Sequence, residues 1–245
     1  VIVYHSFVLF LKGNDISCGY CEYSPKPESI DRIYPQGYDA IHNVGYLGRH
    51  PSGSFFNREK LEELNYLERF SDYEFVGEFA VDYMLSELAS KGNAGIFRKQ
   101  LTISQAASEA AIDRSLTIIG LNKNAYYTPD ARLKTTVNQT IHISSLKISL
   151  KDKEKLIVKI FMTGLINATF GYKNLLRNGD ICEHYHLESR KMMYWELIWA
   201  GFGFYKKYLE RTKPNRQAAN LHMIKLSYYV VRVALGRVAK RRFYA

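Results

Sequence analysis

Short apolar runs alternate with turn-forming segments in the first part of the chain, and this pattern predicts strands between helices. The predicted strands are Ile16 to Tyr23, Ser54 to Phe56 and Ala94 to Phe97. Residues 24–37 hold three of the six prolines and are predicted to be loop. Three short strands do not make a stable open sheet. Because the sequence begins in a hydrophobic stretch with no initiator Met, we expect a fragment whose remaining strands precede Val1.

Beyond residue 100 the pattern is helical. Residues 102–138 have weak periodicity, broken by Gly, Asn and Pro. Ser149 and Asp152 predict a helix start, because the hydroxyl can accept from a free backbone N–H and the carboxylate faces the positive helix end. Residues 4–12 are predicted to be the end of a helix, and residues 71–91 are predicted to contain another. The other helices predicted span 58–68, 149–178, 191–209 and 218–243.

These patterns predict an α/β fold class in two parts. Residues 1–100 form a mixed α/β part, and residues 101–245 form an all-helical part. The composition agrees, since 47% hydrophobic and 24% charged residues among 245 are ordinary globular values and argue against disorder. No apolar run is long enough to span a membrane, and no signal peptide is evident. Three cysteines are too few for a disulfide framework, which fits a reducing compartment.

The net charge of +10 is concentrated at the C-terminal end. Residues 211–245 contain nine Lys or Arg and no Asp or Glu, whereas residues 1–210 hold 25 basic and 24 acidic residues. This distribution predicts an anionic partner, either a lipid surface or a nucleic acid. The alternative is a helix face that is merely solvated.

The last predicted helix, 218–243, separates apolar from basic positions. Lys225, Arg232, Arg237, Lys240 and Arg241 lie mostly away from the apolar stripe, which is typical of a helix lying on anionic lipid. The stripe consists of Ile224, Tyr228, Val231, Leu235 and Val238. In the alternative interpretation, the stripe packs on the rest of the protein and the charges face water.

The segment from Gly45 to Asn57 is a candidate binding loop. It combines glycines, a proline and serines, and it leads into an apolar strand. Backbone N–H groups near Gly53 could meet a ligand, and Arg49 and His50 add donors, which suits a polyol or a phosphate. A tight connection without a binding role is an equally good interpretation.

Glu78 and Asp82 are a candidate pair of catalytic carboxylates. They are i,i+4 neighbours at the start of the helix that ends at Lys91-Gly92. A carboxylate near a helix N-terminus tends to stay ionised, as a general base must. Acidic residues are also simply favoured in first turns, and on spacing alone this second explanation is the stronger one.

The cysteines and their neighbouring histidines favour structural roles. Cys182-x-His184-x-His186 lacks the paired spacing of zinc sites. Cys18-x-x-Cys21 lies on a predicted strand rather than at a helix start, so a redox role is not expected.

Two segments, Gly48 to Glu59 and Phe75 to Gly92, resemble the acceptor half of family 2 glycosyltransferases of the GT-A (Rossmann-like) fold. The closest group is the bacterial enzymes of capsule and other surface polysaccharide synthesis. Three further segments resemble that group's C-terminal extension, so the resemblance covers most of the chain. These segments are Tyr127 to Leu133, Gly164 to Lys173 and Ile181 to Tyr185.

The resemblance implies roles for particular residues. Asp82 would be the general base and Glu78 its reserve, although the family usually has two adjacent acidic residues and here Val81 precedes Asp82. His50 to Phe56 would line the acceptor side. The residues implied to bind substrate are Arg49, His50, Ser52 and Gly53.

The resemblance also implies a reaction and its partners. The intact enzyme would transfer a sugar, with inversion, from a nucleotide-sugar donor to a hydroxyl of a growing, lipid-linked glycan. Its Mg²⁺ or Mn²⁺ would be held by an Asp-x-Asp motif preceding Val1, so the chain as printed is expected to be inactive. We expect a cytoplasmic protein, peripheral on the inner face of the bacterial cell membrane. A basic nucleic-acid-binding protein and a non-catalytic membrane-surface scaffold are the alternatives.

Overall fold

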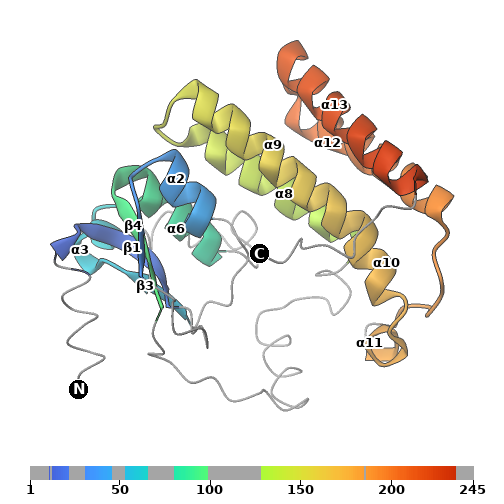
Figure 1. The fold of residues 1–245 in the computed structure, drawn as a ribbon, viewed down its shortest axis with the longest axis horizontal. Coiled ribbons are helices and arrows are strands. Elements are labelled where there is room, and N and C mark those ends of the chain that lie inside the picture. Colours follow the sequence, from blue (N-terminus) through green and yellow to red (C-terminus); the bar gives the residue numbers. More distant parts are fainter. Residues whose placement is uncertain are drawn as a thin grey trace. The chain divides into compact units, whose positions relative to one another are not determined.

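The computed structural model describes residues 11, 13–21, 31–45, 53–65, 80–98, 128–184 and 186–235 (Figure 1). The chain divides into two compact units. The first contains residues 1–106 and 142–156, and the second contains residues 107–141 and 157–245. In the part of the chain described here, no helix is both long and apolar enough to cross a bilayer.

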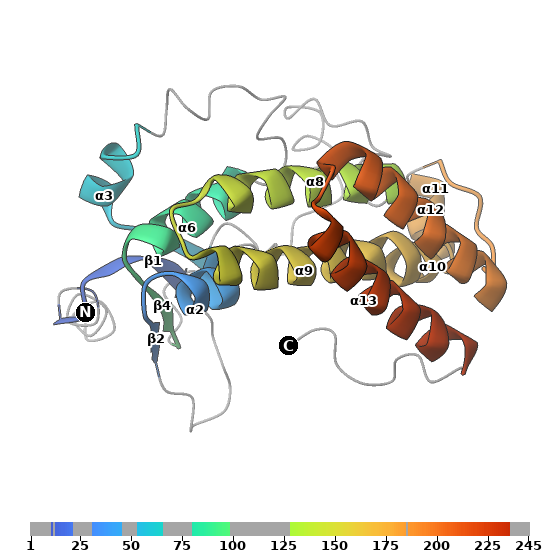
Figure 2. The ribbon, with the colours of Figure 1, turned by 90° about the horizontal axis from the view of Figure 1, so that it is seen from above.

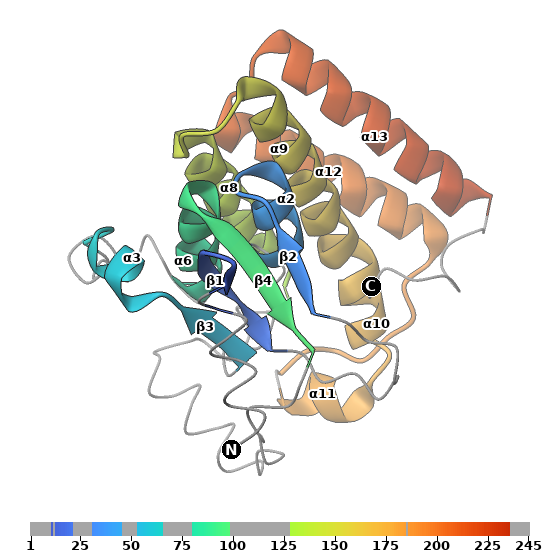
Figure 3. The same cartoon turned by 60° about the vertical axis from the view of Figure 1, so that its left-hand side comes forward.

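The first unit contains a four-stranded mixed sheet with the strand order β2-β4-β1-β3 (Figure 3). β1 and β4 are parallel, and β3 and β2 flank them in antiparallel orientation. The three predicted strands are confirmed, but β2 lies in a segment predicted to be loop, and that prediction was wrong. The strands are β1 (Ile16–Cys21), β2 (Arg32–Tyr34), β3 (Ser54–Phe56) and β4 (Asn93–Phe97).

Burial and a serine hydroxyl hold β1 in the centre of the sheet. Ile16 and Cys18 are buried. The Ser17 hydroxyl donates to the carbonyl oxygens of Leu88 and Asn93, at 3.1 and 2.8 Å. These bonds connect β1 both to the helix that precedes β4 and to the first residue of β4.

That helix is α6 (Ala80–Lys91), and its predicted end at Lys91-Gly92 is confirmed. Its predicted core positions Tyr83, Leu85 and Leu88 are buried. Two short segments, α2 (Tyr38–Ala40) and the π-helical η1 (Ile41–Gly45), pack against α6.

A shorter helix, α3 (Arg58–Glu62), follows β3 and begins where Asn57 caps it. The Asn57 side chain accepts from the Lys60 backbone N–H at 3.1 Å. α3 ends before the predicted end at residue 68, and the chain continues as a turn through residues 63–65.

Two long helices, α8 (Pro129–Ser145) and α9 (Leu150–Ile166), form an antiparallel hairpin (Figure 2). The tip of the hairpin, residues 142–156, belongs to the first unit. The predicted helix start there is confirmed, because the Asp152 N–H donates to the Ser149 hydroxyl at 3.1 Å and that hydroxyl donates to the Asp152 carboxylate at 2.7 Å. No individual helix was predicted within residues 102–138, and α8 occupies that segment from Pro129 onward.

The rest of the hairpin and the helices that follow make the second unit. They are η4 (Asn167–Gly171), α10 (Tyr172–Leu175), α11 (Gly179–His184), α12 (Tyr194–Thr212) and α13 (Arg216–Ala234). A single hydrophobic cluster joins these elements, and Phe161, Leu165, Leu197, Tyr208 and Leu226 are among its buried members. Pro214 lies between α12 and α13.

His222 is fully buried inside this cluster. Its ring lies 4.7 Å from that of Phe161 and 5.3 Å from that of Tyr208, measured between centroids. Within the described residues neither ring nitrogen makes a hydrogen bond. Burial lowers the pKa of His222 to about 4, from an ordinary value of 6.5. The imidazole is therefore neutral at neutral pH.

We expect His222 to make the second unit less stable in acid. Below pH 6.5 the unfolded chain binds a proton at His222 that the folded chain binds only near pH 4. The free energy of unfolding should therefore fall as the pH falls through this interval, by at most about 1.4 kcal/mol per pH unit. Urea unfolding of wild type and His222→Phe across the interval measures the effect. A variant whose stability depends on pH as steeply as that of wild type would contradict it.

Candidate functional site

Asp82 lies at the edge of the sheet where the parallel strands end. Ser17 hydrogen-bonds with Leu88, and the Cys18 thiol donates to the Leu85 carbonyl at 3.5 Å. The later residue of β1, Cys18, thus bonds to the earlier residue of α6, Leu85, so α6 runs antiparallel to β1. The first turn of α6, which contains Asp82, is therefore level with the carboxyl ends of β1 and β4. Ligands of open α/β sheets bind outside these strand ends.

The Asp82 carboxylate affects the pKa of its neighbour Tyr83. Asp82 is only 4% exposed. Burial raises the pKa of the Tyr83 phenol well above its usual range, and the Asp82 charge raises it further. Tyr83 therefore stays protonated and neutral. Its ring meets the buried His142 ring edge-on, with 4.9 Å between centroids.

One turn further along α6, Ser86 faces the segment that leads into the candidate binding loop. The Ser86 hydroxyl donates to the Asp82 carbonyl at 2.7 Å. A Cβ added at Gly45 would lie 2.9 Å from that hydroxyl. Gly45, the last described residue before the gap at residues 46–52, therefore lies beside α6, one turn from Asp82. Residues 46–52 themselves, including Arg49, His50 and Ser52, lie outside the described residues, as does Glu78.

Gly53 and Ser54 lie at the start of β3, after the undescribed residues 46–52. Gly53 is buried, and a Cβ there would lie 2.6 Å from the Tyr20 ring, so the position has no room for a side chain. Ser54 pairs with Tyr20 across the sheet. Its hydroxyl is buried and, within the described residues, makes no hydrogen bond.

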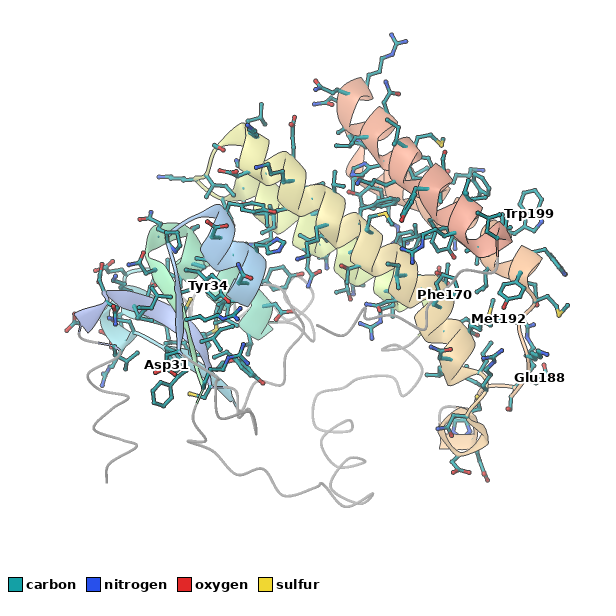
Figure 4. The ribbon with its side chains drawn as sticks, in the orientation of Figure 1. Asp31, Tyr34, Phe170, Glu188, Met192 and Trp199 are labelled. Carbon is teal, nitrogen blue, oxygen red and sulfur yellow. The ribbon has the colours of Figure 1, made fainter. Side chains whose placement is uncertain are left out.

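The same sheet edge carries a polar cluster that was not predicted from the sequence. The Asp31 carboxylate accepts from the Arg98 backbone N–H at 2.7 Å. Burial raises the pKa of the Cys21 thiol to about 11, and the Asp31 charge adds to the effect. Asp31 thus joins the residue after β4 to the last residue of β1. Figure 4 labels Asp31 immediately before β2 and Tyr34 at the end of that strand. No sequence signal pointed to this cluster, because residues 24–37 were predicted to be loop.

The other two cysteines, Cys18 and Cys182, are buried. Burial raises the pKa of the Cys18 thiol to about 12. The Cys182 thiol donates to the Leu175 carbonyl at 3.3 Å. Among the described residues, no group of three or more His, Cys, Asp or Glu side chains is arranged to hold a metal ion.

Comparison with known proteins does not assign the chain to a family. No family model, no curated protein and no solved structure matches the chain. What the structure itself offers is a buried carboxylate in the first turn of a helix, at the carboxyl edge of a parallel strand pair. A carboxylate so placed can accept a proton from a substrate hydroxyl.

Proposed function

We propose that the chain is the acceptor-binding part of an inverting family 2 glycosyltransferase of the GT-A fold. The observation that carries the proposal is the position of Asp82, in the first turn of α6 and level with the ends of β1 and β4. The buried Ser54 hydroxyl and the tightly packed Gly53 come from the neighbouring segment. In this proposal the sheet edge binds a carbohydrate alcohol.

The reaction is a single displacement in which Asp82 is the base. The Asp82 carboxylate takes the proton of the acceptor hydroxyl as that oxygen forms a bond to the anomeric carbon of the donor sugar. The bond between the anomeric carbon and the diphosphate oxygen breaks on the opposite face, and the diphosphate leaves with the electron pair. A positioned base of this kind contributes a rate factor of about 10²–10⁴.

Two features support ionised Asp82 as the base. The N-terminal turn of a helix favours a negative charge. Tyr83 is held neutral by burial and by the Asp82 charge, so it does not compete as a base. Glu78 is the reserve for the same role, and Arg49, His50 and Ser52 complete the proposed acceptor loop.

The donor side belongs to the intact enzyme. A divalent cation, Mg²⁺ or Mn²⁺, would neutralise the charge on the leaving diphosphate. The printed sequence has no Asp-x-Asp motif, and the described residues do not form a metal site. We therefore assign no residue of this chain to the cation. The acceptor proposed is a lipid-linked glycan at the cytoplasmic face of a bacterial membrane.

The test begins with the DNA upstream of Val1. We expect one reading frame that adds a nucleotide-binding strand and an acidic metal motif. Protein expressed from that frame should transfer labelled sugar from a nucleotide donor to lipid extracted from the source cells. A frame that adds neither feature, or a protein that has both and binds no nucleotide sugar, would contradict the proposal.

A further inference from the structure

α12 has an apolar face that the second unit does not use. The helix buries Leu197, Gly201, Phe204, Tyr205 and Tyr208. Trp195, Trp199 and Phe202 follow at i, i+4 and i+7 on another face, and Trp195 and Trp199 are 60% and 66% exposed. Figure 4 shows Trp199 projecting away from the helices of the unit. Exposed aromatic side chains in such a row are typical of an interaction surface.

α13 likewise has two apolar faces. It buries His222, Leu226, Tyr229 and Val233. The predicted stripe lies on the opposite side, and its described members are exposed, with Ile224 at 63% and Leu235 at 62%. Val238 and the rest of the predicted helix beyond residue 235 lie outside the described residues. In the second unit this stripe therefore does not pack on the unit's own core.

The two exposed rows lie on neighbouring helices of the second unit. α12 and α13 pack together, and both bury their other faces in the same hydrophobic cluster. Because each row lies opposite its helix's buried face, both rows point away from that cluster. We call this surface the outer face, and its members are Trp195, Trp199, Phe202, Ile224, Tyr228, Val231 and Leu235.

Basic side chains lie beside members of the outer face. Residues 191–235 contain eight Lys or Arg and two Glu. Lys206 follows Phe202 by one turn, and Lys225 adjoins Ile224. The Arg232 guanidinium lies 5.5 Å from the centroid of the Tyr228 ring.

One of the two acidic residues is already compensated. The Glu196 carboxylate accepts from the Met193 backbone N–H at 2.6 Å and from Arg190 at 2.7 Å. These two donors lower the pKa of Glu196. Lys207 is paired as well, with the Asp130 carboxylate at 2.9 Å. Seven other Lys or Arg of residues 191–235 then stand against Glu210 alone.

We propose that the outer face binds the surface of an anionic phospholipid bilayer. Trp, Tyr and Phe side chains suit the boundary between headgroups and acyl chains, and lysines and arginines around them suit anionic headgroups. A second copy of this chain would bring like charges together. A nucleic acid would leave Ile224, Val231 and Leu235 without an apolar partner. The inference rests on the second unit alone and does not depend on glycosyl transfer.

Vesicle flotation of the full chain tests this inference. We expect the chain to float with phosphatidylcholine vesicles that contain phosphatidylglycerol, and much less with phosphatidylcholine alone. Raising the salt concentration should weaken binding, because salt screens surface charges. Lys225→Gln should lower the partition coefficient about fivefold, as removal of one basic side chain near such a surface predicts.

The apolar contribution needs its own variant. Trp199→Ser with Phe202→Ser should lower the partition coefficient about tenfold or more, because two aromatic side chains no longer enter the interface. Leu150→Ser is the matched control. It removes an exposed apolar side chain, 72% exposed, from the first unit, and should leave binding unchanged. Circular dichroism should show both variants folded, since all three residues are exposed.

Three results would overturn the inference. The first is equal binding to vesicles with and without the anionic lipid. The second is unchanged flotation of the double serine variant. The third is a wild-type protein that does not bind vesicles but forms a dimer in size-exclusion chromatography, or a complex with RNA in a gel shift. If the double serine variant loses that dimer or complex, the outer face binds a different partner.

Discussion

Replacing Asp82 with Asn is expected to lower the rate of sugar transfer by about 10²–10⁴-fold in protein made from the complete reading frame. The amide keeps the shape of the side chain but cannot take the acceptor proton. Asp82 is buried next to Tyr83, so the isosteric change should disturb packing little. The turnover number should fall, while the KM for the acceptor should change little, because the loss affects proton transfer rather than binding.

Asp39→Asn is the matched control for this variant. Asp39 is also an acidic residue in the first turn of a helix, but it is exposed. It should keep the full rate, and Asp82→Glu should recover part of the rate that the Asn variant loses. Full activity in Asp82→Asn would remove Asp82 from the mechanism. An equal loss in both Asn variants would point to a general charge effect.

Gly19→Ala is expected to destabilise the first unit by about 3 kcal/mol or more, the upper end for overpacking. Gly19 lies in β1 and pairs with Gly95 of β4. A Cβ at Gly19 would overlap the Gly95 carbonyl oxygen and the tip of the Phe55 ring, and would lie 2.9 Å from the Gly95 carbonyl carbon. Because backbone atoms of a neighbouring strand cannot move aside alone, β1 and β4 would have to separate.

Urea unfolding followed by circular dichroism measures this loss. Gly13→Ala is the control in the same unit, because a Cβ there meets nothing within 4 Å. It should leave the midpoint unchanged or raise it slightly. If Gly19→Ala unfolds at the wild-type midpoint, the close pairing of β1 with β4 is wrong.

The elements that could be predicted from the sequence are those whose apolar residues form one continuous run or stripe that is buried in the fold. β1, β4 and α6 have apolar runs bounded by turn formers, and burial follows the pattern. β3 was predicted in the same way, although its residues are only partly buried. β2 could not be predicted, because it has three residues, of which Arg32 and Ile33 are exposed. Only its pairing with β4 makes it a strand.

α8 was missed because it buries polar residues. Thr136, Thr140 and His142 are all buried on this helix, so its sequence has weak hydrophobic periodicity. Gly164 of α9 makes this possible, since any Cβ there would overlap the Thr136 hydroxyl. A close approach of two helices through a glycine and a threonine is a tertiary property, and periodicity does not report it.

The candidate site was predicted in part. Asp82 could be named as a candidate because it lies near the start of a helix whose end is marked by Lys91-Gly92. The Asp31 cluster could not, because a sheet edge brings together residue 31 and residue 98. The exposed apolar row of α13 was predicted from the sequence, but this helix has a second apolar row. Only packing against Phe161 and its neighbours decides which row is buried.

The two edge strands of the sheet have a consequence for the behaviour of the protein in concentrated solution. β2 and β3 have three residues each. Pro35 directly follows β2 and has no amide hydrogen to offer. Within the described residues, the sheet therefore presents few outward backbone groups with which a strand of another molecule could pair. Fibrous aggregation seeded from the folded sheet should be slow.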